Sequence, residues 1–224
     1  RFLIPPIPNL YFTRDAAFVV HEHGYRAVMA SDVRAGEAAI MAPVLASLGV
    51  AVDDHLNRRA DKNKSIRLEG GDILVLDGDT LIIGVSERSS ASGVDELLEN
   101  IAGERETPLR VVVVELPSER ATIHLDMIVT VVGPGVLLGY LPFLVGREAR
   151  RVFTMTVPPG YGGRWTIREQ EDLLHGLEAV GRPHRIIPCG GDHAVIRERE
   201  QWFSACNSVA LGPQHIVVYR NNPA

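Results

Sequence analysis

Four segments of the chain each predict a β-hairpin, and each hairpin begins directly after a polar residue. The hairpins are expected over residues 16–30, 73–85, 127–140 and 208–219. Each turn contains glycine, and Asp77-Gly78 between two apolar runs is a strong hairpin signal. The polar residues that precede the hairpins are Asp15, Asp72, Asp126 and Asn207. A supersecondary unit that recurs in this way restricts the chain to a repeat architecture.

The segments between the hairpins add helices and further strands, so that each unit is expected to be a ββαβ module. Helices are expected over residues 33–48, kinked or broken at Pro43, and at the capping patterns that begin at Ser92 and Thr166. Further strands are expected over residues 110–116, 152–157 and 185–187. The longer last interval predicts an insertion around residues 142–165. Residues 53–64 are charged and lack apolar periodicity, so we expect a mobile surface loop there.

Composition excludes several classes of protein. The 224 residues, 46% of them hydrophobic, are sufficient for one domain over residues 1–224 with a substantial core. The net charge is −5 and the basic residues are scattered without interleaved aromatics, so nucleic acid is not an expected partner. No apolar run is long enough for a bilayer or a signal peptide, and we expect no membrane association and a cytoplasmic location. Two cysteines, Cys189 and Cys206, fit a reducing compartment.

The acidic hairpin starts predict a site for a cation. Modules arranged around a pseudo-rotation axis bring equivalent strand ends to the centre, so Asp15 and Asp126 would face one another there. Two carboxylates suit a planar guanidinium, which donates bidentate hydrogen bonds. His124 lies two residues before Asp126, and Glu69 could orient its imidazole and raise its pKa. Each of these residues taken singly is more often structural, but the set favours a general acid/base beside a bound cation.

The motifs that contain these residues resemble those of the arginine deiminases, in the same order and over nearly the whole chain. They are Asn9-Leu-Tyr-Phe-Thr-Arg-Asp15, Glu69-Gly-Gly-Asp72, Gly84-Val-Ser-Glu-Arg88, His124-Leu-Asp126, Cys189-Gly-Gly-Asp192, Arg199-Glu-Gln-Trp202 and Val218-Tyr-Arg-Asn221. The resemblance implies the pentein fold, an α/β propeller of five ββαβ modules, of which this chain would hold about four. It also implies hydrolysis of L-arginine to L-citrulline and ammonia without a metal or an organic cofactor.

The same resemblance implies roles for individual residues. Asp15 and Asp126 would clamp the substrate guanidinium, His124 would be the acid/base, and Glu69 would be its partner. The substrate-binding residues would be Asn9, Phe12, Arg34, Asp72 and Arg88, with Arg34 and Arg88 pairing with the α-carboxylate of arginine. The alternative for Arg88 is a surface arginine beside the following helix.

The family attacks the guanidinium carbon with a cysteine thiolate, which the resemblance places in a Gly-rich Arg-Cys segment beyond residues 218–221. Cys189 and Cys206 do not match that position, and we expect both to be buried small hydrophobic residues. The chain alone is therefore expected to be inactive, as a fragment of a full enzyme. The alternatives are completion by another chain segment or a homo-oligomer, a degenerate arginine-binding protein, and, within the same fold, amidinotransfer or hydrolysis of methylated arginines.

Overall fold

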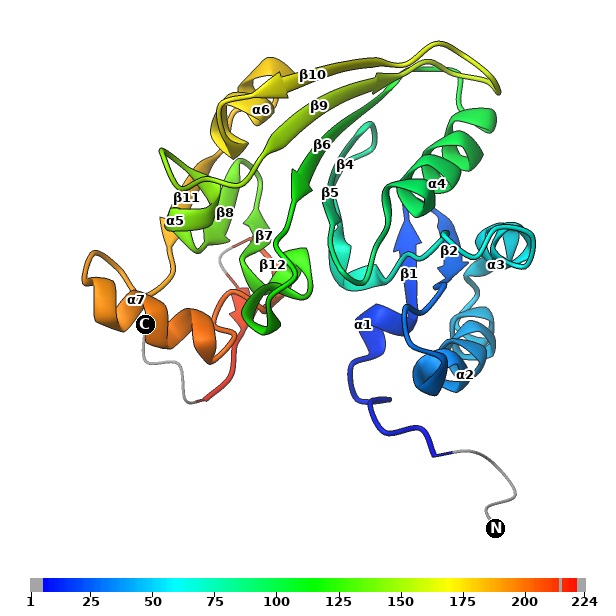
Figure 1. Cartoon of the computed structure of the whole chain (residues 1–224), viewed down its shortest axis with the longest axis horizontal. Coiled ribbons are helices and arrows are strands. Elements are labelled where there is room, and N and C mark those ends of the chain that lie inside the picture. The colour runs from blue at the N-terminus through cyan, green and yellow to red at the C-terminus, as the bar shows by residue number, and fades with distance from the viewer. Residues whose placement is uncertain (1–5, 214, 221–224) are drawn as a thin grey trace.

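The chain folds into successive modules that follow one another in an arc, from the first module at the lower right of Figure 1 to the third at the left. A computed structural model describes residues 6–213 and 215–220. Three sheets of three, five and three strands and one two-stranded hairpin make up the arc. In the described part of the chain the sheets do not close into a barrel.

The first module is a ββαβ unit that follows a short helix. Its elements are α1 (Thr13–Ala16), β1 (Ala17–Val20), β2 (His23–Arg26), the 3-10 turn Asp32–Arg34, α2 (Ala35–Ser47) and β3 (Ala51–Asp53). Strand β2 pairs antiparallel with β1 and parallel with β3. The return strand begins at His23, two residues earlier than expected, because His21 adopts a left-handed φ of 56° and tightens the turn.

Two expectations for the first module are corrected. Helix α2 is not broken at Pro43 but runs through it. Both Pro43 and Ala39 are exposed, so water can bind the Ala39 carbonyl oxygen that the proline leaves without a helical donor. Residues 53–64 are not a loop, because they contain helix α3 (His55–Ala60). Its Leu56 side chain is fully buried, although one short helix offers too few apolar residues for a visible period.

The second module repeats the ββαβ order. Its elements are the 3-10 turn Gly70–Asp72, β4 (Ile73–Asp77), β5 (Thr80–Val85), α4 (Ala91–Gly103) and β6 (Leu109–Glu115). Strand β5 pairs antiparallel with β4 and parallel with β6. Helix α4 is capped by Ser90 rather than Ser92, since the Ser90 hydroxyl accepts a hydrogen bond from the Gly93 N–H at 3.1 Å.

The third module contains the expected insertion. Its elements are the 3-10 turns Arg120–Thr122 and Leu125–Met127, β7 (Val129–Gly133), β8 (Val136–Gly139), α5 (Leu141–Leu144), β9 (Val152–Val157), β10 (Thr166–Gln170), α6 (Leu173–Ala179) and β11 (Arg185–Pro188). Strands β7, β8 and β11 form the module's own sheet, with β8 and β11 parallel. Strands β9 and β10 instead join the second module's sheet through the antiparallel pair β6–β9, and they arch over the top of the molecule in Figure 1.

The helix expected at Thr166 is wrong, because residues 166–170 form strand β10. Each of these residues pairs with one residue of β9, so the strand partner overrides the capping pattern. The helix begins later, at α6, where the Asp172 carboxylate accepts a hydrogen bond from the His175 N–H at 3.0 Å.

The last elements are a helix and the fourth hairpin. Helix α7 (Ala194–Trp202) precedes the antiparallel strands β12 (Val209–Gly212) and β13 (His215–Val217). Residue 214, in the expected turn, lies outside the described residues. The described chain therefore holds three ββαβ modules and the opening hairpin of a fourth.

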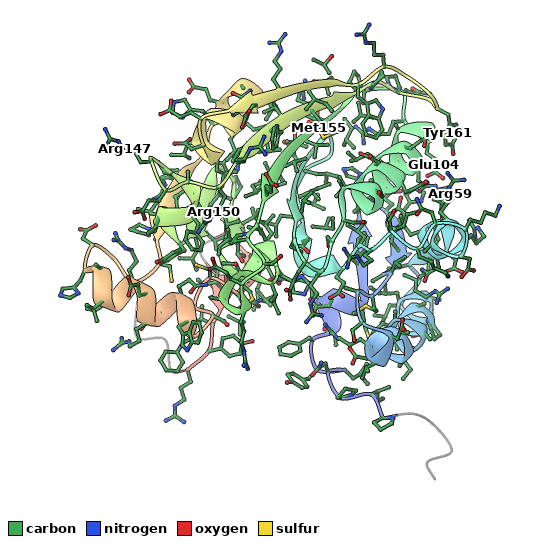
Figure 2. All side chains as sticks on the ribbon, viewed as in Figure 1. Arg59, Glu104, Arg147, Arg150, Met155 and Tyr161 are labelled. Carbon is green, nitrogen blue, oxygen red and sulfur yellow. The ribbon has the colours of Figure 1, made fainter. Side chains whose placement is uncertain are left out.

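The central sheet is buried on both faces, which explains the continuous β-branched run of β6. Val111 and Val113 pack with the first module and α4, where Met155 of β9 also lies (Figure 2), whereas Val112 and Val114 pack with the third module. A strand buried on both faces is apolar at every position rather than at alternate ones. Among the described residues, no helix is long and apolar enough to span a bilayer.

Candidate active site

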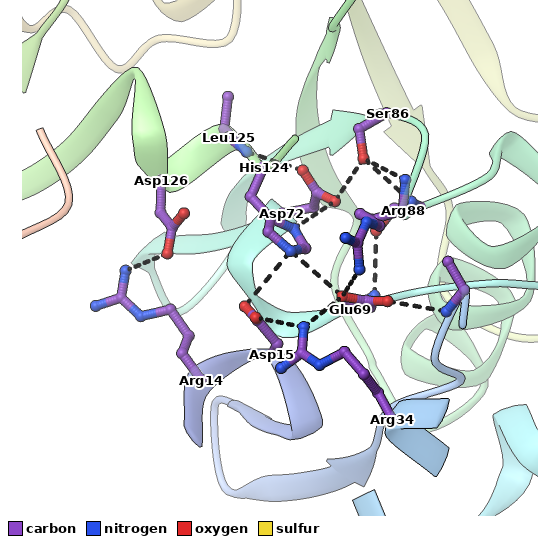
Figure 3. Close-up of polar contacts among 12 residues, drawn as sticks. Arg14, Asp15, Arg34, Glu69, Asp72, Ser86, Arg88, His124, Leu125 and Asp126 are labelled. Atoms are coloured by element: carbon purple, nitrogen blue, oxygen red, sulfur yellow. Dashed lines mark hydrogen bonds and ion pairs between the residues drawn. The ribbon is translucent and has the colours of Figure 1, made fainter. Parts of the chain in front are cut away.

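The starts of the three modules converge on one buried polar cluster (Figure 3). Asp15 lies in α1, and Asp72 and Asp126 lie in the 3-10 turns that precede β4 and β7. Glu69 and His124 immediately precede those two turns, with extended backbones that carry both side chains into the cluster. All five side chains are buried. The expectation that separate modules bring their acidic strand starts together therefore agrees with the geometry.

The imidazole of His124 lies among three carboxylates. Its Nδ1 is 3.2 Å from Asp72 Oδ2, and its Nε2 is 3.3 Å from Glu69 Oε2 and 3.6 Å from Asp15 Oδ1. Burial by itself would lower the pKa of His124, but the hydrogen bonds with Asp72 and Glu69 and the charge of Asp15 outweigh it and raise the pKa to about 11. The imidazole is consequently protonated at neutral pH.

Asp72 holds the imidazole in place and does not contact open space. Its Oδ1 accepts a hydrogen bond from the Leu125 N–H at 2.9 Å, and its Oδ2 accepts one from the Ser86 hydroxyl at 2.8 Å. Asp72 is fully buried, so the geometry does not favour the substrate contact expected for it. Its contacts instead fix the orientation of the His124 imidazole. Sequence reasoning missed Ser86, although it lies within a quoted motif.

Glu69 contacts both the imidazole and two arginine side chains. Burial opposes its ionisation, but hydrogen bonds from His124 and from the Ala30 N–H, at 2.8 Å, outweigh burial and lower the pKa of Glu69. Arg88 Nη1 lies 3.7 Å from Glu69 Oε2. The expected pairing of Glu69 with His124 is thus present in the geometry.

Arg34 is turned into the cluster rather than toward an incoming ligand. Its Nη1 donates to Asp15 Oδ2 at 2.9 Å and to Glu69 Oε2 at 3.4 Å, and its Nε donates to Glu37 Oε2 at 2.8 Å. The side chain is 6% exposed. These contacts use Arg34 as an internal counter-ion, so they do not favour the expected role on a substrate α-carboxylate.

Asp126 is paired with Arg14, which sequence reasoning did not single out. Arg14 Nη1 donates to Asp126 Oδ2 at 3.2 Å. Burial raises the pKa of Asp126 to about 6, even though His124 and Arg14 act in the opposite direction. Its other oxygen, Oδ1, is buried and has no hydrogen-bond partner among the described residues.

The remaining expected residues lie around the cluster. Asn9 donates its backbone N–H to Glu37 Oε1 at 3.0 Å, which ties the segment before α1 to the Arg34 side of the site. The Phe12 side chain is exposed and packs on Tyr11 with ring centroids 4.1 Å apart. Arg88 is the least buried of the cluster's cationic neighbours after Arg14, with 24% of its side chain exposed. Substrate contact by Asn9, Phe12 and Arg88 stays a prediction.

Two glycines make room for this cluster. A Cβ on Gly71 would lie 2.8 Å from His124 Cγ and 2.9 Å from Asp15 Oδ1, and one on Gly84 would lie 2.5 Å from Asp72 Oδ1. Only glycine lets the backbone approach the ion pairs so closely. Gly71 lies in Glu69-Gly-Gly-Asp72, between the two acidic residues, and Gly84 begins the motif Gly84-Val-Ser-Glu-Arg88.

Both cysteines are buried free thiols, as expected. The Cys206 thiol shares a hydrogen bond with that of Cys189, which together with burial raises the pKa of Cys206. Its backbone carbonyl accepts a hydrogen bond from the Thr130 hydroxyl at 2.6 Å. A raised pKa disfavours the thiolate that a nucleophile requires, so Cys206 is unsuited to attack.

One set of side chains could in principle hold a metal ion. Donor atoms of Asp15, Glu69 and His124 lie within 4.8 Å of one another. The three carboxylates around His124 raise its pKa to about 11, so a metal ion would have to displace a tightly held proton from the imidazole. Arg34 already supplies positive charge to both carboxylates. The arrangement therefore suits a guanidinium better than a metal.

Comparison with known proteins defines the class of fold and then the family. A DDAH from Pseudomonas aeruginosa, a cysteine-to-serine mutant solved with citrulline, superposes with a TM-score of 0.60 at 18% identity, over 97% of this chain and 64% of that one. A mutant of AgrE solved with L-arginine superposes with a TM-score of 0.60 at 20% identity, over 92% of this chain and 24% of that one. The chain has the pentein fold, which confirms the expected fold class.

The family model for arginine deiminase matches residues 1–224. An arginine deiminase from Levilactobacillus brevis is 31% identical over 99% of this chain and 54% of its own length. Another, from Listeria monocytogenes, is 29% identical over 99% of this chain and 54% of its own length. The chain belongs to the arginine deiminase family, and it spans about half the length of the curated relatives it matches.

Proposed function

We propose that this chain forms the guanidinium-binding and proton-transfer part of an arginine-hydrolysing protein of arginine catabolism. In the intact parent protein the reaction would be hydrolysis of L-arginine to L-citrulline and ammonia. One observation carries the proposal: the His124 imidazole, held by Asp72 and Glu69, lies in one buried cluster with the carboxylates of Asp15 and Asp126. Membership in the arginine deiminase family supports the same substrate class.

The proposal gives each part of the site a step in the reaction. Asp15 and Asp126 would bind the guanidinium, whose planar donors match carboxylate oxygens. A cysteine thiolate would add to the guanidinium carbon, and ammonia would leave after accepting a proton from His124. Water would then add to the amidino-thioester and release citrulline and the thiol. Because both cysteines of this chain are buried, we propose that a cysteine outside these 224 residues supplies the thiolate.

His124 is prepared to act first as an acid. Its pKa of about 11 keeps the proton on the imidazole until a substrate arrives. A bound guanidinium adds positive charge beside Asp15 and competes for the same carboxylates, which would lower the pKa of His124 and release the proton to the leaving group. The resulting neutral imidazole could then accept a proton from the attacking water.

The second candidate is a protein that binds arginine without turning it over. The burial of Cys189 and Cys206 favours it, because an acidic clamp without a reactive thiol can bind but not attack. Citrulline formation separates the two candidates. Product identity likewise separates arginine hydrolysis from amidinotransfer and from hydrolysis of methylated arginines.

The test compares binding and turnover in the wild type and three variants. We expect L-arginine binding, measured by calorimetry, to be lost in Asp126→Asn and retained in Asp54→Asn, which removes an acidic partner of Arg26 away from the cluster. Turnover is measured as citrulline formation in the full-length protein that the gene encodes. The variant His124→Ala is expected to bind L-arginine but to form no citrulline. Unaltered binding in Asp126→Asn would refute the clamp.

The remaining parts of the proposal concern organisation and partners. We propose one domain over residues 1–224, since both core clusters share the central sheet. The proposed partner is a small molecule, L-arginine, rather than a nucleic acid, in keeping with the net charge of −5.

A further inference from the structure

Two arginine side chains of this chain already occupy the carboxylates that are proposed to bind the substrate. Arg34 contacts Asp15 at 2.9 Å, and Arg14 contacts Asp126 at 3.2 Å (Figure 3). Each presents the same guanidinium group that a free arginine would present. A ligand can therefore reach these carboxylates only by sharing or replacing an internal cation.

The two internal arginines are held very differently. Arg34 is 6% exposed and contacts Asp15, Glu37 and Glu69, so removing it would leave several buried charges without a partner. Arg14 is 34% exposed and has one carboxylate partner. Its second contact, from Nη2 to the Ser208 carbonyl oxygen, is long at 3.3 Å. Of the pair, Arg14 is the side chain that can leave at the lower cost, because it is more exposed than Arg34 and has fewer carboxylate partners.

Two features around Arg14 favour its displacement by a ligand: its carboxylate partner has an unused oxygen, and an adjacent cavity can take the side chain. Asp126 Oδ1 is buried and has no hydrogen-bond partner among the described residues, so the single contact with Arg14 leaves this carboxylate incompletely satisfied. Arg14 also lines a cavity of about 390 Å³ between β1, β4, β7 and β12. The walls of that cavity include Ala17, Thr130 and Val209, and the space can accept the displaced side chain.

We propose that Arg14 is a built-in competitor for the guanidinium site: it occupies Asp126 in the absence of ligand and must leave before a guanidinium ligand binds there. This inference rests on the proposed function, because it assumes that Asp126 receives the guanidinium. Arg14 would then be a residue that sets the affinity of the site, without contacting the reacting atoms.

The test is calorimetric titration of L-arginine into the wild-type chain, Arg14→Gln and Arg14→Lys at pH 8. Arg26→Gln is the control, since Arg26 is exposed to a similar degree as Arg14 and also pairs with one aspartate, Asp54, away from the cluster. We expect Arg14→Gln to bind L-arginine about fivefold more tightly, which corresponds to about 1 kcal/mol, the upper range for a partly exposed ion pair. Arg14→Lys should lie between it and the wild type, and Arg26→Gln should match the wild type.

Two further readouts separate competition from a merely loosened structure. L-Citrulline carries a neutral ureido group in place of the guanidinium, so its affinity should not increase in Arg14→Gln. The pH profile should also move: the groups that set the ionisation of Asp126 are His124, Arg14, Asp15 and Asp72, and loss of Arg14 removes one that favours the charged form. The pKa of Asp126 should therefore be higher in Arg14→Gln. As the pH is lowered, this variant should begin to lose arginine affinity at a higher pH than the wild type does.

The outcomes distinguish this inference from the function on which it rests. If the wild type binds L-arginine and Arg14→Gln binds it equally or more weakly, competition by Arg14 is refuted while the proposed function stands. If no variant binds L-arginine although all unfold cooperatively, the proposed function itself fails. Binding that appears only in Arg14→Gln would support both.

Discussion

The buried contact between Asp72 and His124 leads to a prediction for the variant Asp72→Asn. The substitution keeps the shape of the side chain and removes its charge, so a protonated imidazole loses the negative charge that lies 3.2 Å from its Nδ1. Removing one member of a buried ion pair costs about 3–5 kcal/mol. For a chain of this size, each kcal/mol lowers the melting temperature by about 2–4 °C, so a decrease of roughly 6–20 °C is expected.

The pH dependence of this cost provides a stricter test. The folded-state pKa of His124, about 11, lies above its ordinary value of 6.5, so its stabilising contribution is complete below pH 6.5 and is lost as pH rises through about 11. Asp72 is among the groups that raise this pKa, so Asp72→Asn should be most destabilising near pH 7. The difference from the wild type should shrink toward pH 10.

The assay is urea-induced unfolding of both proteins between pH 7 and pH 10, with Asp54→Asn as the control. Asp54 pairs with Arg26 at the surface, where such a pair contributes about 0–1 kcal/mol. An unfolding cost for Asp72→Asn that equals the control, or that stays constant with pH, would contradict the assignment of Asp72 as the partner of a charged His124.

Three further outcomes can be checked independently. Gly70→Ala should destabilise the fold by about 1–3 kcal/mol, because the added Cβ would overlap the Arg14 carbonyl oxygen. Gly78→Ala is the control, since its Cβ would enter open space, and chemical denaturation compares the two variants. Leu56→Ala should cost about 2–5 kcal/mol in the same assay, and a cost below 0.5 kcal/mol would contradict the packing of α3. L-Arginine affinity, measured by calorimetry, should fall as pH is lowered through about 6, where Asp126 gains a proton and loses its charge; a flat profile would exclude Asp126 from binding.

The sequence predicts the repeat and the convergence well because both depend on local signals. Glycine-containing turns between apolar runs identify the hairpins, and the position of an acidic residue before a strand determines which end of the module it reaches. His124 and Glu69 could be paired for the same reason. The fold class followed from the order of several motifs, which a single motif would not have established.

The errors arise where tertiary contacts override local signals. Residues 166–170 satisfy a capping pattern, yet pairing with β9 makes them a strand. The pairing of Arg14 with Asp126 was missed because an arginine that lies next to an aspartate in sequence shows no sign of reaching a different one. Likewise, nothing local in the sequence shows that Arg34 contacts three buried carboxylates, so its substrate contact stays a prediction.

The arm formed by β9 and β10 has a consequence for how such a protein can change over time. It belongs to the third module in the gene but completes the second module's sheet, with six residue pairs between β6 and β9. Deleting the third module would expose the edge of β6, and deleting the second would expose the edge of β9. The second and third modules therefore share one sheet, and a functional exchange between related proteins would have to move both modules together.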